Sequence, residues 1–321
     1  MRKIIAVTRK IPDAGLELFT DEYEIRLSKQ DRVLKEPELK KLVTGADGII
    51  ALLTDKIDAS ILEAAGKQLK IVANFAVGFG NIDLAAAKKK KIVVTNTPGV
   101  LTEAVAEHAI ALMLAVSRRI VESDKFTRAG RYEGWEPELL LGPELQGKTL
   151  GILGLGRIGR RVAEIAALGL GMKVVYYDNG NRNRELDVKI GSEAVTIRKL
   201  LTQSDVISIH VPLTKETHHL IGKAELATMK KSAILVNTSR GPVVDEKALS
   251  QALQKKVIWG AGIDVFEFEP NITPELLKLE NVVMTPHTAS ATIEARNGMS
   301  ELAAKNVMAV LEGHAPLSPV K

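Results

Sequence analysis

The chain has 321 residues, of which 45% are apolar and 26% are charged, a composition typical of globular proteins and enough for about two domains. Its 44 basic and 39 acidic residues give a formal net charge of +5 and an isoelectric point near 9.2, too small an excess to predict nucleic-acid binding. The absence of cysteine excludes disulfides and thiolate chemistry, and the longest apolar region, residues 109–116, is far too short for a membrane span.

The first hundred residues alternate short β-branched runs with helical patterns. They open on a strand pattern rather than on the long apolar stretch of a secretion signal, so we expect a cytoplasmic protein with no membrane or nucleic-acid partner. Strands are expected at residues 3–7, 23–27, 48–53, 69–74 and 92–95, and helices near 12–20, 36–44, 58–66 and 82–90. This alternation predicts a parallel sheet covered by helices on both faces.

A second alternating series follows a break at residues 97–102, where proline and glycine interrupt the pattern. A long helix is expected from Glu103 to about Ala129. The strands expected after it are 149–153, 173–177, 206–210, 233–237, 257–263 and 282–284, and the last segment, 293–311, is helical. We therefore predict an α/β protein of two doubly wound parallel-sheet domains, with the chain crossing between them near residues 103 and 288.

Residues 151–159 contain Gly154, Gly156 and Gly159 in the G-x-G-x-x-G spacing, after an apolar strand and at the start of a helix. In that context the first glycine permits a tight turn, the second lets the backbone approach a pyrophosphate, and the third lets the helix pack on the strand. Asp178 ends the next strand, where an acid binds both ribose hydroxyls and repels a 2′-phosphate. NAD is the expected cofactor, and the nearby Arg182 and Arg184 leave NADP possible.

Four polar residues come at or just after the ends of strands in the second series: Arg240, Asp264, Glu269 and His287. Loops at the carboxyl ends of parallel strands line the ligand crevice. A guanidinium offers a fork for a carboxylate, and an imidazole exchanges protons near neutral pH. A carboxylate beside the imidazole, for which Glu269 is the candidate, would keep it charged and fix its tautomer. Asp264 could accept a hydrogen bond from the nicotinamide carboxamide. Hydride transfer to a 2-keto acid needs such groups besides the cofactor.

With these residues in place, the chain resembles the D-isomer-specific 2-hydroxyacid dehydrogenases essentially from end to end. The resemblance rests on long motifs in the order that the family has them: AVGFGNID (76–83), TNTPGVLT (95–102), GKTLGILGLGRIG (147–159), HVPLTKET (210–217), NTSRGPVVDE (237–246), DVFEFE (264–269) and TPH (285–287). It implies a flavodoxin-like substrate domain, residues 1–100 plus 289–321, and a Rossmann NAD-binding domain, residues 101–288.

The resemblance also implies a role for each motif residue. Arg240, Glu269 and His287 would be the catalytic triad, with His287 as the proton donor in reduction. The substrate would be held by Leu53, the backbone N–H groups of Val77 and Gly78, Arg240 and His287. The cofactor would contact, besides the three glycines and Asp178, Arg157, Ile158, Val211, Pro212, Thr217, Thr238, Ser239, Arg240, Asp264 and His287. A homodimer is expected, with the long helix after Thr102 and the loop around Trp135 in its interface.

Two positions bear on the substrate. Phosphoglycerate dehydrogenases of this family usually carry an arginine for the phosphate three residues before the position of Val77, where this chain has Asn74. The loss of a charge-assisted partner disfavours a phosphorylated substrate. A small substrate facing Leu53 fits the glyoxylate/hydroxypyruvate reductase group. One departure is Gly80, which replaces the acidic or amide residue common before N-I-D, and its effect on specificity is open.

The expected activity is the NAD(P)H-dependent reduction of glyoxylate or hydroxypyruvate to the D-2-hydroxy acid. A D-lactate or broad-specificity D-2-hydroxyacid dehydrogenase is the alternative within the class, followed by a phosphoglycerate dehydrogenase. A non-catalytic NAD-sensing protein, similar to corepressors of this fold, is the alternative of another class, which the intact triad disfavours.

Three further histidines are assigned no chemistry. His218 and His219 are adjacent, so their side chains are expected to point apart, without the spacing of metal ligands, and no metal site is expected. His108 lies in the middle of a helix among apolar residues and is expected to be packed and hydrogen-bonded.

Overall fold

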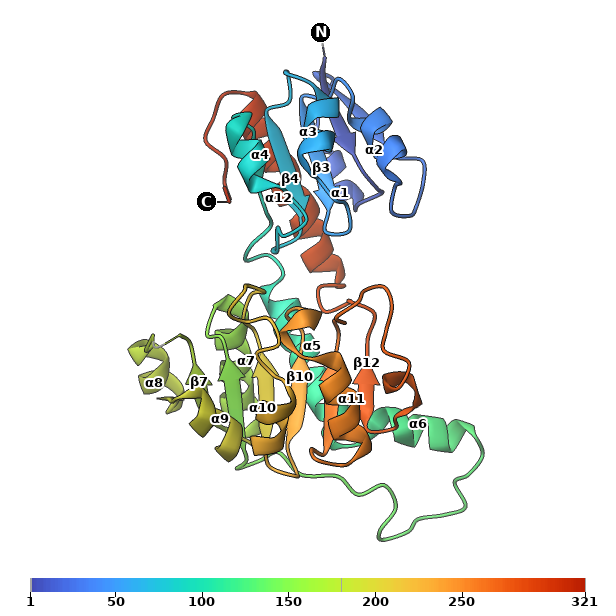
Figure 1. Ribbon diagram of the computed structural model, residues 1–321, viewed down its shortest axis with the longest axis vertical. Coiled ribbons are helices and arrows are strands. Elements are labelled where there is room, and N and C mark those ends of the chain that lie inside the picture. The colour runs from blue at the N-terminus through green and yellow to red at the C-terminus, as the bar shows by residue number, and fades with distance from the viewer. Residues whose placement is uncertain (1, 180, 321) are drawn as a thin grey trace. The chain divides into compact units, whose positions relative to one another are not determined.

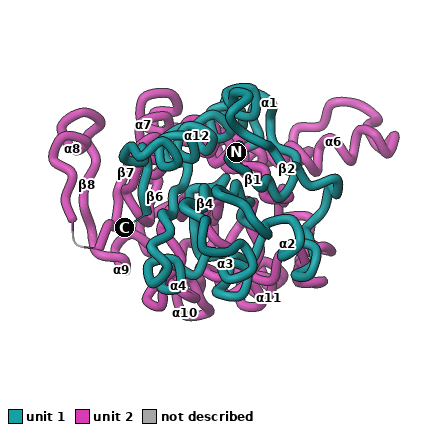
Figure 2. Tube along the Cα trace, turned by 90° about the horizontal axis from the view of Figure 1, so that it is seen from above, with its two compact units in different colours: residues 1–101, 291–321 teal, residues 102–290 magenta. Residues whose placement is uncertain are grey.

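The computed structural model describes residues 2–179 and 181–320, and the chain divides into two compact units. Residues 1–101 and 291–321 form the first unit and residues 102–290 the second (Figure 2). The chain therefore passes between the units twice, after Leu101 and after Ser290. Each unit contains a parallel sheet with its own core, which confirms the predicted fold class.

The first unit contains a five-stranded parallel sheet with the order β2-β1-β3-β4-β5. Figure 1 labels its strands β3 and β4. Its strands are β1 (Lys3–Val7), β2 (Tyr23–Leu27), β3 (Gly48–Leu52), β4 (Ile71–Phe75) and β5 (Val93–Thr95). The central strands β3 and β4 are almost entirely buried, as a sheet covered on both faces requires. This order is that of the flavodoxin-like doubly wound fold.

Helices cover both faces of this sheet. They are α1 (Asp13–Leu16), α2 (Glu36–Val43), α3 (Ala59–Ala65), α4 (Leu84–Lys89) and α12 (Ile293–Leu311). The C-terminal helix α12 packs on β3 and β4 beside α1, and α2, α3 and α4 cover the other face. A Cβ added at Gly15 in α1 would lie 2.2 Å from the carbonyl oxygen of Ser300 in α12, so only glycine permits this close helix contact.

The second unit contains a seven-stranded parallel sheet with the order β12-β11-β10-β9-β6-β7-β8. Its strands are β6 (Thr149–Leu153), β7 (Lys173–Tyr177), β8 (Glu193–Ala194), β9 (Val206–Ile209), β10 (Ile234–Asn237), β11 (Gly260–Ile263) and β12 (Val282–Met284). This is the Rossmann order extended by one strand. It makes β10, β11 and β12 neighbours, so their carboxyl ends lie along one edge of the sheet (Figure 1).

Two helical layers enclose the seven-stranded sheet. The helices are α5 (Thr102–Ser117), α6 (Ile120–Arg128), α7 (Arg157–Leu170), α8 (Arg184–Ile190), α9 (Ile197–Gln203), α10 (Lys223–Thr228) and α11 (Glu246–Gln254), with the short 3₁₀ turns η1 (Gly241–Val243) and η2 (Leu276–Lys278). Helices α5 and α7 pack on one face of the sheet. Helices α9, α10 and α11 cover the other face and contribute apolar side chains to its core.

The prediction of a single helix between residues 103 and 129 is wrong, because the structure has two helices there, α5 and α6. They meet at Arg119, whose backbone is left-handed with φ +52°. The end of α5 is buried at Ser117, and a Cβ added at Gly142 would lie 1.9 Å from the Ser117 carbonyl oxygen. The chain returning past Gly142 therefore covers the end of α5, while α6 has no buried residue.

The expected strands agree with the structure in number and order except for the two-residue β8, which the sequence did not predict. Their ends differ by a few residues, most at β11, which begins at Gly260 rather than 257. No helix in the described part of the chain has the length and apolar character that a bilayer crossing requires.

Candidate active site

The polar residues identified in the sequence lie at the C-terminal ends of strands of the seven-stranded sheet. Arg240 follows β10, Asp264 and Glu269 follow β11, and His287 follows β12. Since these three strands are neighbours, residues up to 47 positions apart in the chain come together within one unit.

His287 and Glu269 form a direct pair. The Nδ1 atom of His287 lies 2.9 Å from Oε2 of Glu269. The other carboxylate oxygen of Glu269 accepts a hydrogen bond from the Phe266 N–H, at 2.9 Å. Each side chain keeps about a third of its surface exposed, at 29% for His287 and 32% for Glu269. Because Nδ1 is engaged, Nε2 is the ring nitrogen left to exchange a proton with a ligand.

The charge of Glu269 is stabilised by its surroundings. Burial alone would raise the pKa of this carboxyl group. The hydrogen bonds from His287 and from the Phe266 N–H, together with the charges of His287 and Arg240, outweigh burial, so the pKa is held below its usual range. Glu269 is therefore ionised at neutral pH and can fix the tautomer of the histidine.

The backbone of His287 is held in the left-handed region, with φ +55°. Its N–H donates to the carbonyl oxygens of Asp264, at 2.9 Å, and Thr285, at 3.0 Å. A non-glycine residue in this conformation persists only where its surroundings over-determine it, and such residues cluster at functional sites. The turn therefore presents one imidazole at the sheet edge.

The side chain of Asp264 holds this turn by accepting hydrogen bonds from it. Its side chain is fully buried and accepts hydrogen bonds from the N–H groups of Thr288, at 2.7 Å, and Ala289, at 2.8 Å, and from the Thr285 hydroxyl, at 2.6 Å. Burial acts to raise its pKa, but these bonds and one from His108 hold the pKa below its usual range. The carboxylate is thus already engaged by protein donors, and acceptance from a nicotinamide carboxamide stays a prediction for Asp264.

His108 in α5 completes the network, a contribution that the sequence did not suggest. Its Nε2 lies 2.9 Å from the Thr285 hydroxyl oxygen and 3.4 Å from Oδ1 of Asp264. Because the Thr285 hydroxyl donates to Asp264, its oxygen is free to accept, so His108 donates through Nε2. The expectation of a packed, hydrogen-bonded histidine is confirmed, and the residue supports the turn that carries His287.

Arg240 lies beside Glu269 just after β10. A Cβ added at the following residue, Gly241, would lie 1.9 Å from the carbonyl group of Phe266, so the two loops touch along their backbones. Arg240 itself is partly buried, and its guanidinium donates to the Ser239 carbonyl oxygen at 2.6 Å. Burial lowers the pKa of Arg240, and the charge of Glu269 opposes that shift. A guanidinium stays charged at neutral pH in either case.

The glycine motif forms the turn between β6 and α7. Gly154 has φ +92°, a conformation that favours glycine. A Cβ added at Gly159 would lie 2.1 Å from the Gly154 carbonyl oxygen, whereas a Cβ at Gly156 would meet nothing within 4 Å. Space for a ligand therefore remains over Gly156, the N-cap of α7, where Arg157 and Ile158 form the first turn. A helix N-terminus of this kind is suited to a pyrophosphate.

Two further polar groups of the second unit are candidates for contacts with a dinucleotide. Asp178, at the end of β7, accepts a hydrogen bond from the Leu155 N–H at 3.2 Å, which fixes the carboxylate beside the glycine turn. The Thr238 hydroxyl after β10 is buried and has no partner among the described residues. Buried hydroxyl groups are usually hydrogen-bonded, so this one is available to a ligand or to water, as are those of Thr95 and Thr97 in the first unit. The residues present therefore fit a bound cofactor.

Other predicted cofactor residues are engaged within the protein. The Thr217 hydroxyl donates to the Pro212 carbonyl oxygen at 2.6 Å and accepts from the Thr214 N–H at 2.7 Å. It closes the loop that follows Val211, so its side chain shapes that loop. The Ser239 hydroxyl donates to Oδ1 of Asn237 at 2.9 Å.

The predicted substrate residues of the first unit lie at the ends of its strands. Leu53 follows β3 and is 37% exposed, and Val77 follows β4 and is 36% exposed. The amide of Asn74 donates to the Gly78 carbonyl oxygen at 2.7 Å, which fixes this loop from inside. A Cβ at Gly80 would meet nothing within 4 Å, so packing does not explain the glycine. These residues belong to the first unit, whereas Arg240 and His287 belong to the second.

The expectation that His218 and His219 point apart is wrong. Their ring centroids lie 4.1 Å apart with an interplanar angle of 33°. The reason is the backbone of His219, which has φ +52° and turns its ring back over its neighbour. Histidine adopts the left-handed conformation more often than most residues, but the sequence does not show which histidine does so.

Comparison with known proteins places this geometry in a family. Residues 110–289 match the family described as D-isomer specific 2-hydroxyacid dehydrogenase, NAD binding domain. The chain is 51% identical over 320 residues to a glyoxylate reductase from Thermococcus litoralis, covering 98% of this chain and 96% of the relative.

Two solved structures are similar over almost the whole chain. A protein from Thermus thermophilus has a TM-score of 0.93 at 43% identity, covering 99% of this chain and 100% of that one. An NADPH-dependent glyoxylate/hydroxypyruvate reductase from Sinorhizobium meliloti, solved with NADP and malonate, has a TM-score of 0.86 at 35% identity, covering 100% and 97%. The sheet order, the glycine turn and the similarity along the full length lead to one conclusion: the chain belongs to the family of D-isomer-specific 2-hydroxyacid dehydrogenases.

Proposed function

We propose that the protein reduces a small 2-keto acid, glyoxylate or hydroxypyruvate, to the D-2-hydroxy acid with NADH. The observation that carries the proposal is the pair of His287 and Glu269, 2.9 Å apart, with Arg240 beside it on the edge of the sheet that also carries the glycine turn. The similarity to a glyoxylate reductase over 98% of the chain supports the substrate class.

Each side chain has a defined task in this reaction. When bound, the nicotinamide supplies the hydride to the carbonyl carbon. The carbonyl oxygen gains negative charge as hydride arrives, and His287 protonates it through Nε2. Glu269 stabilises the protonated ring through Nδ1 and holds its orientation. Arg240 grips the substrate carboxylate and the developing oxyanion with its planar fork.

Three of the residues proposed to bind the substrate belong to the first unit. Backbone N–H groups of Val77 and Gly78 hold the substrate carboxylate, and Leu53 limits the size of the group next to the carbonyl. The internal hydrogen bond from Asn74 to Gly78 supports this role, because it orders the loop that presents those N–H groups. Asn74 offers no positive charge for a phosphate, which favours an unphosphorylated substrate.

A panel of 2-keto acids tests this function. We expect NADH oxidation with glyoxylate and hydroxypyruvate at higher kcat/KM than with pyruvate or 3-phosphohydroxypyruvate. Glycolate has no stereocentre, so the D-configuration should be determined on the glycerate formed from hydroxypyruvate. Highest kcat/KM with pyruvate would instead indicate a D-lactate or broad-specificity enzyme. Tight NADH binding without turnover of any of the four acids would indicate an NAD-sensing binding protein.

Asp178 is proposed to select NADH over NADPH. Its carboxylate lies at the end of β7, fixed by the Leu155 N–H, where it would repel a 2′-phosphate. We expect Asp178→Asn to shift the ratio of kcat/KM for NADPH to that for NADH by roughly tenfold or more, since one tenfold step corresponds to about 1.4 kcal/mol. Glu185→Gln, which removes a charge from an 85% exposed side chain of α8, is the matched control. An unchanged ratio in Asp178→Asn would refute the selective role.

The oligomeric state is also a proposal. We infer a homodimer that uses α5, α6 and the loop around Trp135. Trp135 is 81% exposed and Leu141 is 59% exposed, while α6 buries none of its residues within the chain. A homodimer contact over this segment would cover these exposed apolar side chains. A cytoplasmic location stays a prediction.

A further inference from the structure

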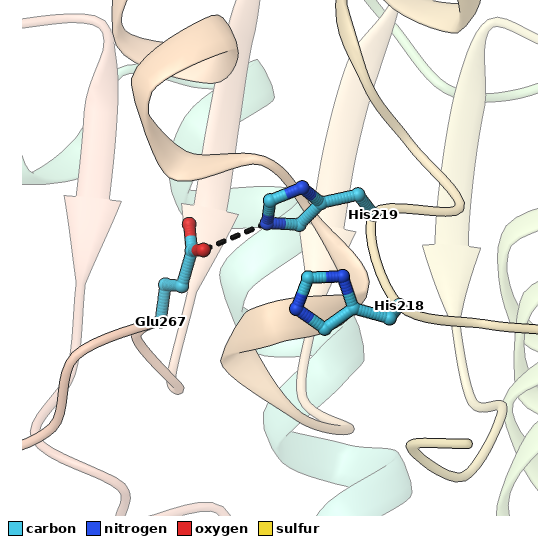
Figure 3. A group of neighbouring side chains, drawn as sticks. All are labelled: His218, His219 and Glu267. Carbon is cyan, nitrogen blue, oxygen red and sulfur yellow. Dashed lines mark hydrogen bonds and ion pairs between the residues drawn. The ribbon is translucent and has the colours of Figure 1, made fainter. Parts of the chain in front are cut away.

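A cluster of two histidines and a glutamate lies outside the residues assigned to the reaction. His218 and His219 belong to the segment between β9 and α10, and Glu267 follows β11. The Nε2 atom of His219 lies 2.7 Å from Oε1 of Glu267. One ligand atom from each of the three residues lies within 4.8 Å of the others. Figure 3 shows the three side chains directed toward one another.

The backbone fixes both histidines in this arrangement. The His219 N–H donates to the Pro242 carbonyl oxygen at 2.8 Å, and the His218 N–H donates to the Thr214 carbonyl oxygen at 3.0 Å. His219 adopts φ +52°, which brings the rings of two adjacent residues to the same side of the chain. The backbone of this segment therefore places the two rings next to each other.

Glu267 is held in place by hydrogen bonds with Glu246. Its Oε2 accepts a hydrogen bond from the Glu246 N–H at 3.1 Å, and its own N–H donates to Oε2 of Glu246 at 2.7 Å. The Glu267 side chain is only 12% exposed, whereas that of His219 is 37% exposed. This reciprocal anchoring leaves Oε1 directed at the histidines as a preorganised oxygen ligand.

We propose that His218, His219 and Glu267 bind a divalent transition-metal ion such as Zn²⁺. Two imidazoles and one carboxylate are the ligand set that zinc, cobalt and nickel take, whereas calcium and magnesium prefer all-oxygen sites. Three protein ligands leave a fourth position for water. A cavity of about 500 Å³ beside the cluster, lined by His219, Glu267, Asp245 and Glu275 among others, provides room for that water.

Binding requires only small movements. The metal ion takes the place of the hydrogen between Nε2 of His219 and Oε1 of Glu267. Because imidazole binds metals in its neutral form, the ring then carries its hydrogen on Nδ1. Rotation of the His218 side chain brings its ring nitrogen to bonding distance, about 2.0–2.1 Å from zinc. The bond from Glu246 to Oε2 of Glu267 is kept, so the loop that also carries Glu269 stays in place.

Metal titration of the full-length, tag-free and chelator-treated protein tests the proposal. We expect one Co²⁺ per chain with visible d–d absorption, displaced by Zn²⁺. Zn²⁺ at 100-fold excess over its Kd should raise Tm by about 5 °C, by mass action on the folded state. His218→Asn should weaken Zn²⁺ binding at least tenfold in calorimetry. Glu267→Gln, which keeps an acceptor for the Glu246 N–H, should weaken it as well.

The matched control is His314→Asn, which removes an exposed histidine from the first unit and should bind Zn²⁺ like the wild type. The proposal is overturned if the wild type binds no Co²⁺ or if His218→Asn binds Zn²⁺ with unchanged affinity. It is equally overturned if binding is lost in His287→Ala instead, which would place the metal at the proposed catalytic pair. None of these outcomes depends on turnover, so they are distinct from a failure of the proposed reductase activity.

Discussion

His287→Ala is expected to lower kcat for glyoxylate reduction by roughly 10²–10⁴-fold, the usual contribution of a positioned proton donor. The Nε2 atom of His287 is the proposed donor, and alanine leaves the growing negative charge on the substrate oxygen without a proton. NADH affinity should remain near the wild-type value, since the glycine turn and Asp178 are untouched. Stopped-flow single turnovers and NADH fluorescence titration measure the two quantities separately.

Two further measurements show whether the loss comes from proton transfer. Added imidazole should restore part of the activity of His287→Ala, because a small base can occupy the space that the ring vacates. Glu269→Gln should lower kcat less than His287→Ala, since the amide keeps a hydrogen bond to Nδ1 but lacks the charge that stabilises the protonated ring. If His287→Ala kept wild-type kcat, the assignment of the proton donor would be wrong.

Arg240→Ala is expected to raise KM for glyoxylate roughly 10²-fold and to lower kcat as well. Two charge-assisted hydrogen bonds to the substrate carboxylate are lost, each worth roughly 1.5–3 kcal/mol. In addition, Glu269 loses the neighbouring positive charge that helps to hold its pKa low. Steady-state kinetics over a wide range of glyoxylate concentration separate the two effects.

Arg240→Lys is the conservative control for this prediction. Lysine keeps the charge but not the planar fork, so its KM should fall between those of the wild type and Arg240→Ala. Added guanidinium ion should restore activity to Arg240→Ala and not to His287→Ala. An unchanged KM for glyoxylate in Arg240→Ala would contradict the anchoring role.

Much of the fold was predictable because its signals are local. The alternation of β-branched runs with helical patterns arises from neighbouring residues, and it predicted two parallel sheets with helices on both faces. The glycine spacing at Gly154 and Gly159 was equally informative, since the structure allows no side chain at either position. Convergence of Arg240, Glu269 and His287 could be inferred because parallel strands end at one edge of a sheet.

The features that could not be predicted depend on residues distant in sequence. The long helix breaks where the chain at Gly142 crosses the end of α5, and no pattern within the helix marks that crossing. His108 supports the turn of His287 only because α5 packs beside β12. Its hydrogen-bond partner, Thr285, lies 177 residues later in the chain.

The local pattern of residues therefore determined the strands, the cofactor turn and the kind of chemistry that this protein carries. Tertiary packing decided which hydrogen bonds those side chains form. For example, Asp264 accepts a hydrogen bond from the Thr288 N–H. The ring of His219 lies over that of His218 and forms a hydrogen bond with Glu267. The physical reason is that propensity and periodicity act over a few residues, whereas the partners of a buried polar group are set by whichever distant segment the fold brings within about 3 Å.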